Sequence, residues 1–289
     1  MNNNHSLLLK KHEDILSFRD LADSTVSTYI SYMTSFILWV EEQLPGRDIS
    51  SVTWEEMRSY VIFLKNVRNL NPRTINVHLA QLRDFYYYVL HRDWDKREVP
   101  FLHFDERLPI VPDQKLVRLI IGSITNLKHR AEIALLYSSG IRVSELCRLH
   151  CGDIHMSAKR IHIEKGKNRS ERYAVLSERI LPELVTYVKE FYPHATKEDW
   201  LFPNRAGDHI STEAVRCVFS QTLRKLNLSE KGYTLHSLRH AFGLHLYEAG
   251  EDLMSIKEAM GHKALSSTTV YLTLGVGNGR SVTSPYDFK

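Results

Sequence analysis

A stretch near the carboxyl end, TLHSLRHAFGLHLYEAG at residues 234–250, combines an apolar face with a cluster of cationic side chains. Its leucine, phenylalanine and alanine residues recur at helical spacing, which predicts a buried amphipathic helix. His236, Arg239 and His240 share a sector beside that stripe, since successive residues turn by about 100°. All three lie in the first turns, where the helix macrodipole disfavours positive charge. This face therefore predicts an anionic partner.

A second arginine has the same unusual placement. Arg142 begins the segment RVSELCRL, which reads as a short helix directly after Gly140. One interpretation is a simple ion pair with Glu145, three residues further on. Another follows if the fold brings Arg142 and Arg239 together. Two guanidinium forks at helix N-termini would then suit the non-bridging oxygens of one phosphate group.

The segment RIHIEKGKNRSERYAVLS alternates apolar and polar residues on both sides of Lys165 to Asn168, which predicts a β-hairpin. Lys165 has the strand parity of Ile161 and Ile163, so its side chain is expected on the buried side. A lysine there needs an anion or a proton-transfer role. Lys167 fits a solvated charge or a contact to a polyanion.

A tyrosine completes the set of chemically suggestive residues. Tyr271 follows a Gly261-His262 pair by nine residues, in the segment DLMSIKEAMGHKALSSTTVYL. A phenol has an unperturbed pKa near 10, so it is a weak nucleophile at neutral pH unless cations or a base assist it. The histidines and arginines described above are suitable neighbours.

Composition limits the possible classes of protein. The 289 residues are 43% hydrophobic and 25% charged, with a net charge of +4 and a pI near 8.8, which permits a polyanionic partner. Three cysteines (Cys147, Cys151 and Cys217) are too few for a disulfide framework, and we interpret them as buried or incidental thiols rather than metal ligands. Neither a membrane span nor a signal peptide is recognisable, so we expect a cytoplasmic protein associated with the nucleoid.

Two domains are expected from the chain length. Residues 1–95 read as a helical bundle, with helices over 25–42, 54–66 and 73–91, and the aromatic run at 85–88 is interpreted as core rather than as a base-stacking platform. Charges and prolines predict a linker over 96–112. Residues 113–289 predict a mostly helical domain with a small antiparallel sheet and a tail over 272–289. The fold class is therefore mainly α.

The order and spacing of these motifs resemble the tyrosine recombinase (phage integrase) family. The resemblance rests on Arg142 in SSGIRVSELCRL, Lys165 in the hairpin, HSLRH at 236–240, Gly261-His262 and Tyr271, and it covers nearly the whole chain. It implies an N-terminal SAM-like core-binding domain and a helical catalytic domain that together clamp DNA. It also implies site-specific cutting and rejoining of double-stranded DNA, by a protein that assembles as a tetramer on paired sites.

The resemblance assigns roles to the clustered residues. It implies that Tyr271 attacks the scissile phosphate and forms a 3′-phosphotyrosine, leaving a free 5′-hydroxyl. Arg142 and Arg239 would stabilise the charge of the transition state. Lys165 would be the general acid for the leaving 5′-oxygen.

The remaining roles are assigned in the same way. His236 would be a general base or hydrogen-bond partner, and His262 a further donor to the phosphate. Glu145 would orient the cations, and His240 would support the site by packing and hydrogen bonding. Arginines would replace the metal ions of two-metal nucleases, so no metal is expected, and no cofactor or ATP is needed because the phosphotyrosyl ester keeps the energy of the broken bond.

Two further expectations concern the tail and the DNA. The tail has three glycines in five residues (275, 277 and 279), so it is a poor helix, and Val282, Tyr286 and Phe288 suggest that it docks on a neighbouring protomer as an extended segment. Its SPYD ending is similar to those of integron integrases and transposon recombinases, which favours a mobile-element integrase. Contacts to DNA are expected from Arg73, Arg83, Lys167, Arg216 and Arg224.

Two other functions fit the same pattern. A DNA-binding architectural protein would keep the fold without the chemistry, but it predicts losses among the catalytic positions, and all of them are filled. A type IB topoisomerase-like enzyme would relax supercoils and rejoin the same strand. Relaxation of a plasmid that lacks any recombination site would distinguish it from a recombinase.

Overall fold

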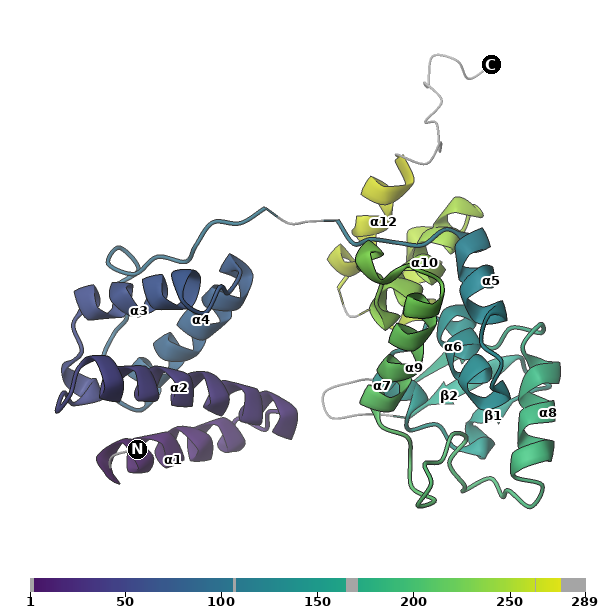
Figure 1. The fold of residues 1–289 in the computed structure, drawn as a ribbon, viewed down its shortest axis with the longest axis horizontal. Coiled ribbons are helices and arrows are strands. Elements are labelled where there is room, and N and C mark those ends of the chain that lie inside the picture. Colours follow the sequence, from purple (N-terminus) through teal and green to yellow (C-terminus); the bar gives the residue numbers. More distant parts are fainter. Residues whose placement is uncertain (1–2, 106–107, 165–170, 263, 277–289) are drawn as a thin grey trace, which may run out of the picture. The chain divides into compact units, whose positions relative to one another are not determined.

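The computed structural model describes residues 3–105, 108–164, 171–262 and 264–276. The chain divides into two compact units, Met1–Glu106 and Arg107–Lys289, which are described separately (Figure 1). The first is helical, and the second combines helices with one three-stranded sheet. The expected fold class, mainly α with a small antiparallel sheet, is therefore confirmed.

The first unit is a four-helix bundle. Its helices are α1 (Asn3–Phe18), α2 (Asp23–Gln43), α3 (Trp54–Asn66) and α4 (Pro72–Tyr88), with a 3₁₀ turn at Ile49–Ser51. Thr53 and Glu56 form a reciprocal capping box at the start of α3, and Asn71 caps α4 ahead of a proline in its first turn. These local signals explain why both helices begin where the sequence predicts.

The aromatic run at the end of α4 divides between core and surface. Phe85 and Tyr86 are fully buried, and the hydroxyl of Tyr86 donates a hydrogen bond to the carbonyl of Ile49. Tyr87 and Tyr88 are 55% and 41% exposed. The core interpretation therefore holds for the first two rings and is wrong for the other two, because α4 turns its last residues towards solvent.

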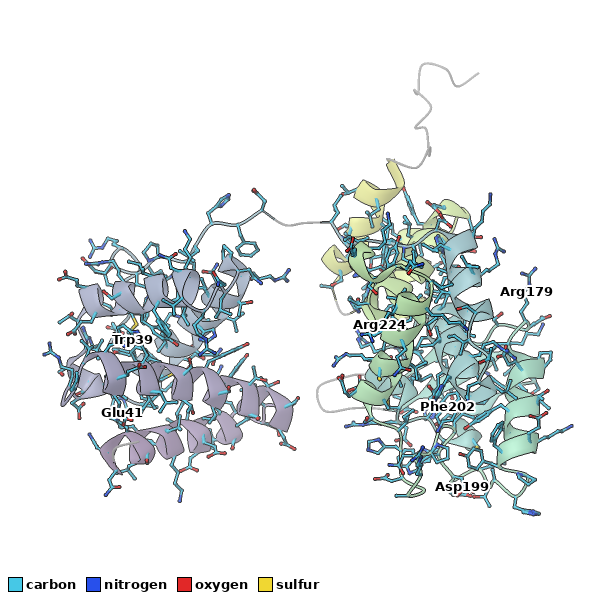
Figure 2. All side chains as sticks on the ribbon, in the orientation of Figure 1. Trp39, Glu41, Arg179, Asp199, Phe202 and Arg224 are labelled. Carbon is cyan, nitrogen blue, oxygen red and sulfur yellow. The ribbon has the colours of Figure 1, made fainter. Side chains whose placement is uncertain are left out.

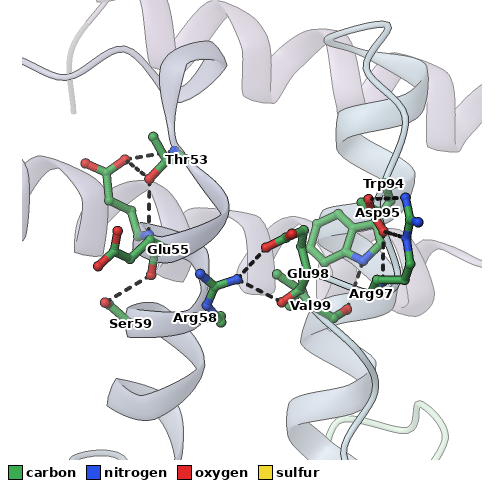
Figure 3. A network of polar contacts seen from close by, with 10 residues as sticks. Thr53, Glu55, Arg58, Ser59, Trp94, Asp95, Arg97, Glu98 and Val99 are labelled. Atoms are coloured by element: carbon green, nitrogen blue, oxygen red, sulfur yellow. Dashed lines mark hydrogen bonds and ion pairs between the residues drawn. The ribbon is translucent and has the colours of Figure 1, made fainter.

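The segment that follows α4 is held against the first unit by polar contacts (Figure 3). Arg58 of α3 donates hydrogen bonds to the carboxylate and the carbonyl of Glu98, at 2.7 and 3.2 Å. The indole of Trp94 donates to the carbonyl of Val99 at 3.1 Å, and Val99 is 3% exposed in the core. The chain around residue 98 therefore belongs to the bundle.

This packing corrects the expected start of the linker. Leu102 exchanges two hydrogen bonds of 2.8 Å with the side chain of Asn76 on α4 and packs against the core. Residues 96–102 are thus part of the first unit, although 96–112 was the expected linker. A few isolated apolar residues anchor the segment, and they are too sparse to create a periodic pattern.

The second unit contains the remaining elements. Its helices are α5 (Gln114–Gly122), α6 (Leu127–Ser139), α7 (Val143–Leu146), α8 (Leu181–Phe191), α9 (Thr212–Lys225), α10 (Leu235–Glu248), α11 (Leu253–Met260) and α12 (Ser266–Val276), with 3₁₀ turns at Cys151–Asp153 and Ser229–Lys231. The strands β1 (Ile154–His155), β2 (Arg160–Ile163) and β3 (Arg172–Val175) pair antiparallel in that order. Ile161 pairs with Ala174 on the buried face.

Helices α6 and α10 pack side by side at the centre of this unit (Figure 1). Gly140 ends α6 in the left-handed conformation with φ of 62°, and a Cβ there would lie 2.2 Å from the ring of Phe242 on α10. Only glycine satisfies both demands. The close approach brings the C-terminal end of α6 beside the first turns of α10, where the cationic residues lie.

The helix that carries Tyr271 is longer than expected. A tail was expected from residue 272, but α12 continues through Gly275 to Val276. Val270 and Leu274 pack against the small core around α10 and α11, and this burial outweighs the poor helix propensity of the glycine. The tail residues Val282, Tyr286 and Phe288 lie outside the described residues.

Two expectations from composition can be compared with the structure. Cys147 is buried, and burial raises the pKa of its thiol to about 11, whereas Cys151 is partly buried and Cys217 is exposed. The described helices include none with the length and apolar character needed to cross a bilayer.

One buried carboxyl group makes the stability of the second unit depend on pH. Glu132 on α6 is fully buried, neither of its oxygens has a hydrogen-bond partner among the described residues, and burial raises its pKa to about 7. The unfolded pKa is 4.5, so the contribution of this carboxyl to the free energy of unfolding is greatest below pH 4.5. That contribution is lost as the pH rises through 7, because the unfolded carboxyl ionises more readily than the buried one. The loss amounts to about 3 kcal/mol.

We expect Glu132→Gln to remove this loss, because a neutral amide has nothing to ionise. Between pH 5 and pH 8.5, urea unfolding should show wild type falling relative to the variant by about 2.5 kcal/mol, because the unfolded carboxyl is already largely ionised at pH 5. Glu190→Gln, at an exposed position on α8, is the control and should follow wild type. Parallel behaviour of wild type and Glu132→Gln would contradict the prediction.

Candidate active site

Two arginines from different parts of the second unit converge at the C-terminal end of α11. Arg142 precedes α7, and its guanidinium donates to Oε1 of Glu145 at 2.8 Å and to the carbonyl of Gly261 at 3.4 Å. Arg239 on α10 is 3% exposed and donates to the carbonyls of Gly140 and Met260. The structure thus brings together the two guanidinium groups that the sequence singled out.

The end of α11 is electrostatically suited to hold these cations. Its last carbonyl groups carry the negative end of the helix macrodipole, which offsets the positive charge beside them. Gly261 ends the helix with φ of 62°, and a Cβ there would lie 2.1 Å from Nε of Arg172. Glycine is therefore required both by the backbone and by the side chain packed over it.

Glu145 connects the first of these arginines to a third. One carboxylate oxygen accepts from the guanidinium of Arg142, and the other accepts from Arg172 at 2.8 Å and from the backbone N–H of Arg142 at 2.8 Å. Burial raises the pKa of Glu145, but the charges of Arg172 and Arg142 and their hydrogen bonds outweigh it, so the net pKa is lowered. The carboxylate stays ionised and fixes both guanidinium groups.

Sequence reasoning missed Arg172. It stands at the start of β3, and only 12% of its side chain is exposed. Arg172 and Ala174 have the same parity, so the alternation of the strand places both on the inward side. The same signal singled out Lys165 in the sequence, and it could have identified Arg172 as well.

A cavity of about 540 Å³ opens beside the arginine pair. Its polar lining comes from the start of α7, the face of α9 and the first turn of α10, with the side chains Arg142, Ser144, Arg216, Ser220, Tyr233, Thr234, His236 and Arg239. The two guanidinium groups bond to the adjacent carbonyls of Gly261 and Met260, and burial together with the charge of Arg142 lowers the pKa of Arg239. An anion entering the cavity would relieve this repulsion.

Three histidines surround the arginine pair as neutral groups. Desolvation and the arginine charges lower the pKa of His236 below its usual value, and burial lowers the pKa of both His240 and His262 to about 4. The ring of His236 contacts that of His240 edge to face, with 4.5 Å between centroids. At neutral pH these rings therefore act through hydrogen bonds rather than through charge.

Tyr271 lies behind the histidines. His240 contacts both its hydroxyl and the ring of His236, which lines the cavity. The tyrosine side chain is fully buried, and its hydroxyl is 3.4 Å from Nδ1 of His240 and 3.4 Å from the sulfur of Met260. The ring lies against Gly243, where a Cβ would come within 2.5 Å of it. Burial raises the pKa of the phenol to about 12, against the opposing effect of Arg239. In this state the hydroxyl is neutral and is not part of the cavity lining.

The other candidate residues are distributed over both units. Lys165 and Lys167 lie outside the described residues. Arg216 on α9 lines the cavity, and Arg224 lies exposed near the end of the same helix (Figure 2). On α4 of the first unit, Arg73 is exposed, whereas the guanidinium of Arg83 packs over the ring of Phe101 at 5.6 Å. The contacts of Arg83 are therefore partly internal to the bundle.

Comparison with protein families gives two matches that together span most of the chain. Residues 113–275 match the phage integrase family, and residues 8–96 match the phage integrase N-terminal SAM-like domain. The first match contains every described residue of the site, from Arg142 to Tyr271.

Individual relatives agree with these matches. The integrase/recombinase y4qK of Sinorhizobium fredii is 33% identical over 267 residues, covering 91% of this chain and 84% of the relative. The tyrosine recombinase XerC of Bacillus pumilus is 30% identical over 264 residues, with coverage of 86% and 85%. Among solved structures, the Tn1549 transposon integrase in complex with transposon right end DNA is similar in fold, with a TM-score of 0.71 at 19% identity and coverage of 97% and 96%.

Proposed function

The chain belongs to the phage integrase family and is a tyrosine-type site-specific recombinase, and on that premise we propose that it cuts and rejoins DNA through a covalent 3′-phosphotyrosine. The observation that carries this proposal is the convergence of Arg142 and Arg239 beside one cavity, with the hydroxyl of Tyr271 buried nearby against His240. The cavity offers two guanidinium groups to a single phosphate.

In the proposed reaction the phenolic oxygen of Tyr271 attacks the scissile phosphorus while its proton passes to a general base, for which His236 is the candidate. The bond from phosphorus to the 5′-oxygen breaks, Lys165 gives that oxygen a proton, and a 5′-hydroxyl leaves. The negative charge that builds on the non-bridging oxygens is stabilised by Arg142 and Arg239, which Glu145 and the carbonyl groups at the end of α11 already hold in place. A 5′-hydroxyl from a second DNA strand then reverses the chemistry and releases the tyrosine.

The histidines complete this arrangement through hydrogen bonds. His236 lines the cavity and serves as a general base or hydrogen-bond partner, while His262 donates to a non-bridging oxygen. His240 contacts both the ring of His236 and the hydroxyl of Tyr271. It supports the site by linking the tyrosine to the cavity.

The proposal requires a rearrangement of Tyr271. Its hydroxyl is buried against α10 and Met260, so it must move to reach a phosphate in the cavity. A shift on DNA binding of the part of α12 that follows Thr268 would expose it. The phenol then loses its apolar surroundings and comes closer to the cations, and both changes lower its pKa from about 12.

The partners follow from the same proposal. Double-stranded DNA carrying specific sites is the substrate, and four protomers act on two paired sites. Arg216 and Arg224 on α9, with Arg73 on α4, are exposed and available for contacts to DNA. The protein would act at the nucleoid, and the SPYD sequence near its carboxyl end favours a role in a mobile element.

Independence from metal and nucleotide is the test of this chemistry. Wild type is incubated with nicked DNA from the flanks of its gene, in EDTA and without ATP, and the products are separated on a denaturing gel. We expect the covalent protein–DNA adduct to form as fast as it does with Mg²⁺, because the arginines supply the positive charge. Loss of the adduct in EDTA, restored by added Mg²⁺, would contradict the proposal.

A further inference from the structure

A buried threonine contacts one of the candidate site histidines. The hydroxyl of Thr268 lies 2.9 Å from Nδ1 of His262, and Thr268 is 0% exposed. His262 directly follows Gly261, which holds Arg142 and packs against Arg172. Thr268 lies on α12, three residues before Tyr271. This hydrogen bond therefore connects the helix of the tyrosine to the turn that holds the arginines.

The surroundings of the two groups decide which one donates. Burial and the nearby arginine charges keep His262 neutral, with a pKa of about 4, so only one ring nitrogen carries a proton. If Nδ1 carried it, the hydroxyl would accept, and its own proton would have no acceptor among the described residues. A buried unsatisfied donor is costly. If the hydroxyl donates to Nδ1, this cost disappears and the ring proton resides on Nε2.

We propose that Thr268 is a positioning residue whose hydroxyl donates to Nδ1 of His262 and thereby fixes the ring proton on Nε2. The inference rests on the proposed function, in which His262 donates a hydrogen bond to a non-bridging phosphate oxygen. With Nδ1 occupied by the threonine, only Nε2 can make that donation. Because Thr268 and Tyr271 share α12, the bond also couples the orientation of the histidine to the position of the nucleophile's helix.

Removal of the hydroxyl is the first test. Thr268→Val keeps the shape of the side chain, and we expect it to slow single-turnover cleavage of nicked DNA by about 10–100-fold, as when a group that orients a metal-ligating histidine is lost. Thr268→Ser restores the donor and should remain within about threefold of wild type. Thr186→Val, which removes the hydroxyl of an exposed threonine on α8, is the matched control. Equal rates for Thr268→Val and wild type would overturn the proposal.

A double-mutant cycle separates positioning from a general loss of stability. If Thr268 acts through His262, then Thr268→Val should cost nothing further once His262 is alanine. Losses that multiply in the double variant would show that the threonine acts by another route, and would overturn the proposal. Site binding should be unchanged in all these variants, because phosphate contacts dominate DNA affinity.

A spectroscopic measurement tests the proposal without relying on activity. The full chain, labelled with ¹⁵N-histidine, should show His262 as the Nε2–H tautomer in wild type and as a mixture of tautomers in Thr268→Val. A resonance for Nδ1–H at His262 in wild type would overturn the proposal even if the protein cleaves DNA normally. Failure of the proposed function would appear separately, as site binding without a covalent adduct in wild type.

Discussion

We expect Tyr271→Phe to abolish the covalent protein–DNA adduct and to leave binding to the recombination site within about threefold of wild type. The substitution removes one oxygen, and that oxygen is the proposed nucleophile. Loss of a nucleophile typically lowers the rate by about 10⁴-fold or more. The ring itself stays packed against Gly243, so the fold of the second unit should be preserved.

Tyr233 provides a demanding control for this prediction. It lines the cavity in the present structure, whereas Tyr271 does not, so proximity to the cavity alone would favour Tyr233 as the nucleophile. We expect Tyr233→Phe to retain adduct formation. The two variants should be compared on the same nicked DNA, with a gel-shift measurement of binding beside the denaturing gel. Loss of the adduct in Tyr233→Phe with its retention in Tyr271→Phe would exclude the proposed mechanism.

The second large effect is expected for Arg142→Lys. The guanidinium of Arg142 already bonds to Glu145 and to the carbonyl of Gly261, and it must also bind a phosphate oxygen. A lysine ammonium is a point charge and cannot reproduce the planar fork. We expect cleavage to slow by about 10²–10³-fold, similar to the loss of one donor that stabilises a transition-state oxyanion.

The control for this second prediction is the same arginine-to-lysine substitution at a position away from the cavity. Arg179, before α8, is exposed and remote from the cavity lining, and Arg179→Lys should cleave at the wild-type rate (Figure 2). Single-turnover rates on nicked DNA at saturating protein provide the comparison, so that differences in affinity do not contribute. A rate for Arg142→Lys within about threefold of wild type would be incompatible with bidentate binding of the phosphate.

The sequence predicts much of the fold because its local signals are strong. The capping box at Thr53, the asparagine before Pro72 and the glycine at the end of α6 each specify a helix boundary through backbone hydrogen bonds. Helix α1 was missed, and the reason is physical. Two of its three buried residues are His5 and His12, so the helix does not show an apolar periodicity.

The candidate site was also predicted only in part. Cations placed at helix starts, where the macrodipole opposes them, predicted that Arg142 and Arg239 would face an anion, and the structure places both beside one cavity. The buried position of Tyr271 could not be predicted, since it depends on the fit of its ring against Gly243 and Met260. The contact between Thr268 and His262 likewise depends on the geometry of the turn between α11 and α12. Lys165 remains a prediction from strand parity.

The most direct measurement is to identify the amino acid and the DNA end that become joined. Wild type is trapped on nicked DNA, the adduct is digested with trypsin, and the DNA-linked peptide is sequenced by mass spectrometry while the free DNA end is labelled enzymatically. We predict a 3′-phosphate linked to Tyr271, with a 5′-hydroxyl on the released strand. Linkage to another residue, a 5′-phosphate linkage, or tight site-specific binding without any adduct would contradict the proposed chemistry.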